Sequence, residues 1–88
     1  MPRFYFNAED GECYADEEGV EVPDLKAASA MALRVLAEHL QSKPEHFWEH
    51  DCLKVHVADA AGLHLLTITV SAMFSPALAS RSDIARPG

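Results

Sequence analysis

Histidine is the residue type in this chain with the clearest capacity for chemistry, since five occur in 88 residues. His46 and His50 stand four apart and Cys52 follows closely, so a helix there would gather nitrogen and sulfur ligands of the kind that zinc binds. A proline and two large aromatic residues interrupt the segment, however, and no second ligand cluster matches it. We keep these three residues as the candidate metal ligands and otherwise expect no cofactor. His39 has a structural explanation, because the dipole of a predicted helix favours a histidine near its C-terminus.

The two cysteines are the candidates for nucleophilic catalysis. Cys13 and Cys52 form no Cys-x-x-Cys pair, and a reactive thiolate needs a nearby cation or histidine to lower its pKa. That Cys52 is close to His50 in sequence does not establish such geometry. The four glycines are isolated from one another, so no phosphate-binding loop is present. We expect free thiols and a protein that is not an enzyme, with a metal-binding or thiol protein as an alternative.

Acidic side chains are concentrated near the N-terminus. The net charge is −7, and eight carboxylates lie between Glu9 and Asp24. Such a pole repels phosphate backbones, so we expect no nucleic-acid partner. The charge exceeds what a turn and a helix cap require, which makes a basic protein the expected type of partner. The candidate contact residues are Asp16, Glu17, Glu18 and Glu21, together with Tyr5 and Leu65 of the predicted sheet.

The sequence contains no predicted targeting or membrane-spanning segment. Residues 1–6 carry one positive charge and run directly into polar residues, without the apolar stretch of a signal peptide. No run approaches the roughly 20 apolar residues of a membrane span. We therefore expect a cytoplasmic protein that does not bind membranes.

The N-terminal part predicts a hairpin that leads towards a helix. Residues 3–8 alternate apolar and polar side chains, which is typical of a half-buried strand. Asp10-Gly11 favours a tight turn, so residues 12–15 should return as a second strand. Residues 16–19 then form a second turn, in which a glycine can take a left-handed conformation.

One long helix is predicted in the middle of the chain. Asp24 can cap its first turn, and apolar residues recur at helical spacing up to Leu40. Pro44 cannot continue a helix, so this one should end near Gln41. We expect residues 44–51 to be a connection, with one short helical turn as the alternative.

A second hairpin is the clearest strand prediction. Residues 53–58 and 63–71 alternate on either side of a turn at residues 59–62. Pairing across a four-residue turn sets Val57 opposite His64 and Val55 opposite Leu66, which places His56 and His64 on opposite faces. Two histidines so placed cannot share a metal. The residues predicted to face the core are Leu53, Val55, Val57, Leu66, Ile68 and Val70.

The predicted element order implies a two-layer ββαββ sandwich of the α+β class, with one helix packed on an antiparallel sheet. We expect a single domain over residues 1–74 and a flexible tail over residues 75–88, with a short helix near residues 76–80. One helix leaves one sheet face open, so we predict a homodimer through that face or through a sheet edge. The predicted outer-face residues are Tyr5, His56, Leu63, Leu65, Thr67 and Thr69.

Four sequence segments carry a family resemblance. They are MPRFYF at residues 1–6, the turn Asp10-Gly11, DEEGVEVPDL at residues 16–25 before an alanine-rich helix, and VADAAGLHLLTITV at residues 57–70. In this order they resemble a family of short bacterial proteins known only as a domain of unknown function, over residues 1–71. The resemblance implies a small cytoplasmic bacterial α+β domain and supplies no catalytic residues. His64 departs from the pattern, because the family tends to have an aliphatic residue there.

A fainter resemblance is to antitoxins of the HicB type. In these proteins a hairpin leads through a Pro-Asp-Leu turn to an alanine-rich helix, and VPDLKAA at residues 22–28 is similar. Nothing after Phe74 reads as the DNA-binding unit that such antitoxins often carry. The leading prediction is therefore a non-enzymatic protein-interaction or regulatory module, and the alternative is an antitoxin-type protein that masks a basic partner.

Overall fold

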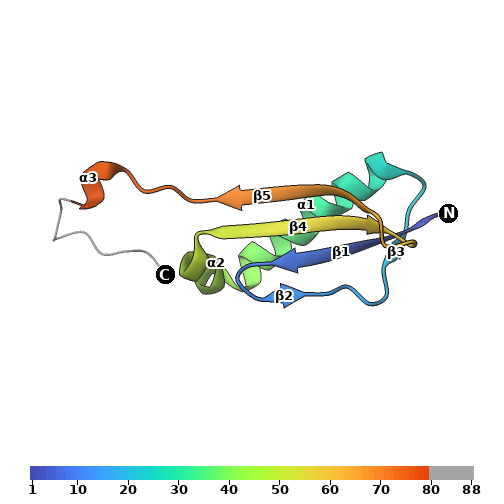
Figure 1. Cartoon of the computed structure of the whole chain (residues 1–88), viewed down its shortest axis with the longest axis horizontal. Helices are drawn as coiled ribbons and strands as arrows, with labels where there is room; N and C mark the ends of the chain where they lie inside the picture. Colours follow the sequence, from blue (N-terminus) through green and yellow to red (C-terminus); the bar gives the residue numbers. More distant parts are fainter. Residues whose placement is uncertain (80–88) are drawn as a thin grey trace.

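The computed structural model describes residues 1–79 and has one long helix packed on a five-stranded antiparallel sheet, which confirms the predicted α+β class. The strand order is β2-β1-β4-β5, and β3 pairs with β1 beside β2. Helix α1 lies behind the sheet in Figure 1, and the other face is open. The elements are β1 (Arg3–Glu9), β2 (Cys13–Tyr14), β3 (Val20–Glu21), α1 (Leu25–Ser42), α2 (Pro44–His50), β4 (Cys52–Asp59), β5 (His64–Ser71) and α3 (Pro76–Ala79).

Helix α1 begins and ends where the sequence predicts. The Asp24 carboxylate accepts a hydrogen bond from the Ala27 N–H at 2.8 Å and so caps the first turn. Ala28 and Ala32 are fully buried, and their small side chains let the helix approach the sheet closely. The helix ends at Ser42, one residue beyond the predicted end.

Helix α2 occupies the segment that we expected to be a connection. Pro44 stands at its first position, where the missing N–H of proline would have had no partner in any case. The same residue therefore ends α1 and begins α2. Asp51 ends α2 in a left-handed conformation (φ 56°), and its N–H donates to the Phe47 carbonyl at 2.7 Å. Phe47 is buried and anchors α2 against the core.

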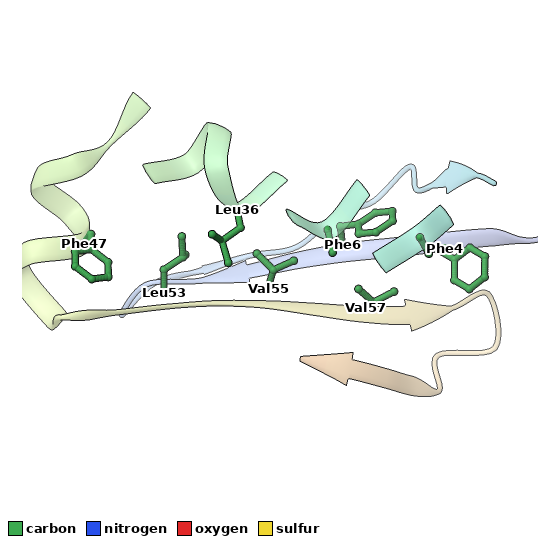
Figure 2. Close-up of a cluster of buried hydrophobic side chains, with 9 residues drawn as sticks. Phe4, Phe6, Leu36, Phe47, Leu53, Val55 and Val57 are labelled. Carbon is green, nitrogen blue, oxygen red and sulfur yellow. The ribbon is translucent and has the colours of Figure 1, made fainter. Parts of the chain in front are cut away.

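The core lies between α1 and the two central strands, β1 and β4 (Figure 2). Leu53, Val55 and Val57 of β4 are fully buried, as the alternation predicts. Helix α1 packs over β1 and β4 rather than over β5. The inner side chains of β5 are therefore only half-buried at the side of this core: Leu66, Ile68 and Val70.

The predicted register of the β4–β5 hairpin is wrong by two residues. Val57 pairs with Leu66 and Ala58 pairs with His64, so β5 has an extra residue, Leu65, at a bulge. The turn explains the shift, because Asp59 both donates its N–H to the Leu63 carbonyl and accepts the Ala61 and Leu63 N–H groups on its carboxylate. A shift of two residues preserves which side chains face the core.

The chain after β5 leaves the sheet. Ala72 still donates its N–H to the Asp51 carbonyl at 2.9 Å, and the Phe74 ring lies 6.2 Å from the Trp48 ring. Helix α3 then falls within the predicted range of 76–80. The rest of the predicted tail, residues 80–88, lies outside the described residues. Among residues 1–79, no helix is long and apolar enough to cross a membrane.

Candidate functional site

A buried carboxylate joins three elements at one end of the molecule. Asp10, in the turn after β1, is only 3% exposed. Its Oδ2 atom lies 2.8 Å from Nε2 of His39 on α1 and 3.6 Å from Nδ1 of His46 on α2. Its Oδ1 atom accepts the N–H of Glu12 at 3.3 Å. We call Asp10, Tyr14, His39 and His46 the Asp10 cluster.

Tyr14 of β2 closes this cluster from the sheet edge. Its hydroxyl donates to the Glu12 carboxylate at 3.1 Å and lies 3.3 Å from Nδ1 of His46. Its ring meets His39 edge-on at 5.2 Å between centroids, and the Lys43 ammonium lies 4.7 Å from the ring centroid. The cluster therefore fixes the β1–β2 hairpin to both helices.

The surroundings of Asp10 and Tyr14 shift the pKa values of both side chains. Burial acts to raise the pKa of Asp10, but the hydrogen bond from His39, the Glu12 N–H and the nearby histidines outweigh it and lower the pKa below 3.8. Loss of hydration, then the hydrogen bond to Glu12 and the charge of Asp10, raise the pKa of Tyr14 to about 12. Asp10 is thus ionised and Tyr14 protonated over a wide pH range, which suits a structural clamp better than proton transfer.

A groove of about 410 Å³ adjoins this cluster, between α1 and the segment that leads from β2 to β3. Buried Phe6 and Ala8 contribute apolar surface to it. The Asp16 carboxylate also lines it but already accepts three backbone N–H groups. The remaining lining residues are Tyr14, Ala15, Val20, Val35, His39 and Lys43.

A second polar cluster lies on the open sheet face. Nε2 of His56 lies 3.0 Å from the Glu9 carboxylate, and its Nδ1 lies 2.8 Å from the Thr67 hydroxyl. Nε2 of His64 lies 2.7 Å from the same hydroxyl, and the two histidine rings are 5.6 Å apart. The prediction that His56 and His64 face opposite sides is therefore wrong, because the bulge turns His64 towards His56.

This cluster makes the open face more polar than the sequence predicts. Tyr5 is half-buried there, opposite Ala58, but the two predicted outer leucines do not form a patch with it. Leu63 lies in the turn and is 62% exposed. Leu65 is half-buried and packs against the core.

The structure separates the three candidate metal ligands. His46 belongs to the Asp10 cluster, the His50 ring lies against Gly11, and Cys52 begins β4. In residues 1–79, no group of three or more histidine, cysteine, aspartate and glutamate side chains could hold a metal ion.

Two of the four acidic candidates have structural roles. The Asp16 carboxylate accepts the N–H groups of Phe6, Glu18 and Gly19 at 3.0–3.2 Å. Glu21 forms an ion pair with Arg3 at 3.1 Å. Glu17 and Glu18 remain as exposed side chains on the same edge.

Comparison with protein families identifies the family of this chain. The model of a domain of unknown function, DUF6894, matches residues 3–71. The chain belongs to this family. No curated protein and no solved structure matches it. The DUF6894 match ends at the last residue of β5, so the sheet with α1 and α2 is the family domain and α3 lies beyond it. The similarity to HicB-type antitoxins stays a prediction.

Proposed function

We propose that this DUF6894 domain is a non-enzymatic protein-interaction module that binds another polypeptide by adding a strand to β5. The observation that carries the proposal is the outer edge of β5: among residues 1–79, β5 pairs with β4 alone. Its sequence, HLLTITVS, has no lysine, arginine, aspartate, glutamate or proline to block an added strand. Such an edge offers its outward N–H and C=O groups to an extended partner.

The side chains beside this edge support the same function. Leu66, Ile68 and Val70 are half-buried because α1 does not extend over β5. An added strand with apolar residues on that side would cover them further, and removal of apolar surface from water is favourable. The edge therefore offers both backbone hydrogen bonds and an apolar strip.

The polar clusters support a non-enzymatic role. Each residue of the Asp10 cluster and of the Glu9–His56–Thr67–His64 cluster makes at least one hydrogen bond within its own cluster. In the described part of the chain, no buried side-chain nitrogen or oxygen lacks a hydrogen-bond partner. These groups stabilise the fold without leaving a buried donor or acceptor free for a substrate.

The test uses a short fluorescent peptide of alternating threonine and valine, with a lysine at each end for solubility. At protein concentrations where the chain is a single copy, we expect saturable binding measured by anisotropy, together with slower amide hydrogen exchange in β5 and unchanged exchange in β1. The control peptide has proline in place of each valine, which removes donor N–H groups. Equal binding of both peptides, or protection outside β5, would contradict strand addition.

A second candidate function is the masking of a basic protein by the acidic edge. It is favoured by Glu17 and Glu18, which are exposed and form no ion pair with another residue of the described range 1–79. Binding of poly-lysine should then weaken in a Glu17→Gln/Glu18→Gln variant and with added salt. Unchanged binding in that variant would remove this candidate.

A further inference from the structure

We propose that the strand added to β5 is β5 of a second copy, paired antiparallel about a twofold axis at Ile68. The inference rests on the proposed strand addition and names its partner. Two identical edges can pair in this way because antiparallel pairing relates equivalent strands by a twofold axis, and no strand within residues 1–79 covers the outer edge of β5.

The residue pattern of β5 is self-complementary about Ile68. With Ile68 opposite its own copy, Leu66 meets Val70 on the helix side. On the open side, Thr67 meets Thr69 of the other copy. Pairs of β-branched and apolar side chains directly across a sheet are stabilising. The register also leaves the bulge at Leu65 near the end of the paired segment, so the central residues form a regular ladder.

The twofold axis would complete the half-covered side of the core. An axis perpendicular to the sheet keeps both α1 helices on one face, so the two β5 strands lie between them. The half-buried side chains of Leu66, Ile68 and Val70 from both copies then form one apolar strip. The side chain of Leu33 on α1 is also 57% exposed in the single copy.

The charge distribution favours a second copy at β5 over contact at the other edge. Five acidic residues lie beside β1, in the turn before β2, in the segment between β2 and β3, and on β3: Glu12, Asp16, Glu17, Glu18 and Glu21. In the proposed dimer the two β2 strands are seven strand spacings apart, roughly 34 Å at about 4.8 Å each. This separation is several times the Debye length of about 8 Å at physiological salt, so the acidic edges of two copies hardly repel each other.

The other edge also limits the assembly to two copies. Strands β2 and β3 cover parts of β1, and the Asp16 carboxylate accepts the Phe6 N–H between them. A dimer through β5 uses the bare edge of each copy and leaves only this covered edge outside. The assembly is therefore closed.

The first experiment is light scattering over a range of concentrations. We expect twice the 9.7 kDa chain mass for the wild type. Ile68→Lys places two like charges opposite each other on the axis and should raise the dimer dissociation constant roughly 100-fold or more. The matched control, Ala61→Lys, adds the same charge in the exposed turn and should remain dimeric. A wild-type mass of one chain throughout, or an Ile68→Lys variant as dimeric as the control, overturns the proposal.

The second experiment keeps the inference testable if Ile68→Lys fails to fold. In a Cys13→Ser/Cys52→Ser background, Ile68→Cys should form a disulfide-linked dimer on mild oxidation. Residues directly opposite in an antiparallel pair have Cα atoms about 4.5–5.5 Å apart, within disulfide range. Val70→Cys is the control, because Val70 faces Leu66 and not its own copy. Cross-linking that is equal or faster at Val70 would overturn the register.

Strand addition and self-pairing can fail separately. If the protein is a single copy at every concentration but the threonine–valine peptide still protects β5, self-pairing is overturned and strand addition stands. If the protein is a single copy and the peptide does not bind, both are overturned.

Discussion

The two edges of the sheet are protected to very different degrees (Figure 1). At the β1 edge, β2 and β3 each pair with two residues of β1, and Asp16 accepts the Phe6 N–H between them. At the β5 edge, an eight-residue strand has no covering strand among residues 1–79, and it contains no lysine, arginine, aspartate, glutamate or proline to block one. Edge strands are normally shielded against further pairing. The difference indicates that this fold blocks growth of the sheet in one direction and permits it in the other.

Between β2 and β3, the β1 edge is protected by a side chain that accepts a backbone hydrogen bond from β1. Asp16 Oδ2 accepts from Phe6 at 3.1 Å, and Oδ1 accepts from Glu18 and Gly19 at 3.2 and 3.0 Å. A full-length strand at this position would itself offer an edge to other chains, whereas a carboxylate offers none. Two short strands and one acidic residue thus cover β1, and each of the two strands offers an outer edge of only two residues.

Asp16→Ala is the change with the largest expected effect on this comparison. It removes the acceptor of three backbone N–H groups, and hydrogen bonds to a charged group contribute about 1.5–3 kcal/mol each without being additive. We expect the free energy of unfolding, measured in urea, to fall by about 3 kcal/mol. The neighbouring control, Glu17→Ala, removes an exposed charge and should change it by less than about 0.5 kcal/mol. Similar losses in both variants would show that Asp16 does not hold this edge.

A pair of glycine substitutions compares the two edges directly. Gly19, before β3, and Gly62, in the β4–β5 turn, have positive φ angles of +72° and +85°. An added Cβ at Gly19 would lie 2.9 Å from the Phe4 carbonyl oxygen, whereas at Gly62 it would meet nothing within 4 Å. Both Gly→Ala changes should cost about 1 kcal/mol for the left-handed backbone, and Gly19→Ala about 1–2 kcal/mol more.

The outcome of this pair is read from urea unfolding and from hydrogen exchange in β1. Gly19→Ala should also expose the β1 edge, so the amide of Phe4, which points to the same side of β1 as the Phe6 amide, should exchange faster. Gly62→Ala should leave it unchanged. Equal unfolding free energies in the two variants would mean that β3 is not tightly held against β1.

The sequence predicts the centre of this fold better than its edges. Alternation identifies β1 and β4 because their two faces meet different surroundings, and the Asp24 cap and Pro44 bound α1. Strand β3 has two residues, too few for any periodicity to be visible. The β4–β5 register depends on one bulge and on the Asp59 turn, and neither has a distinctive residue pattern.

The polar clusters lie beyond what the sequence predicts. Asp10 and His39 are 29 residues apart in the sequence, and Glu9 and His56 are 47 apart. A pattern of local residue spacing therefore cannot predict that they are in contact. The sequence does identify histidine as unusually frequent. It does not identify the hydrogen-bond partners of these histidines, however, because neighbours in sequence such as His50 and Cys52 are more visible than neighbours across a sheet.

Asp10→Asn tests whether the Asp10 cluster holds the hairpin that covers β1. The folded pKa of Asp10 is lowered, so its charge stabilises the fold above the unfolded pKa of 3.8, and this stabilisation is lost as pH falls through the lower folded pKa. At neutral pH we expect Asp10→Asn to lower the unfolding free energy by about 1–2 kcal/mol. The gap between variant and wild type should narrow in acid, below about pH 4. A gap that is constant from neutral to acid pH would exclude a role for the Asp10 charge.

Tyr14→Phe has the smallest expected effect on stability. It tests whether a change at the β2 edge leaves the β5 edge unaffected. The pKa of Tyr14 is raised from 10.0 to about 12, so its protonated form stabilises the fold below pH 10, and this contribution is lost as pH rises towards 12. Ultraviolet titration should therefore show a tyrosinate transition near pH 12 that Tyr14→Phe abolishes and Tyr5→Phe retains. At neutral pH the variant should also weaken protection of the β2 amides, because its ring can no longer hydrogen-bond Glu12 or His46. Self-association through β5 should not change at neutral pH, since Tyr14 lies on the opposite edge. A Tyr14→Phe variant that dissociates the dimer would mean that the two edges are coupled, and the contrast between them would then no longer explain where a partner binds.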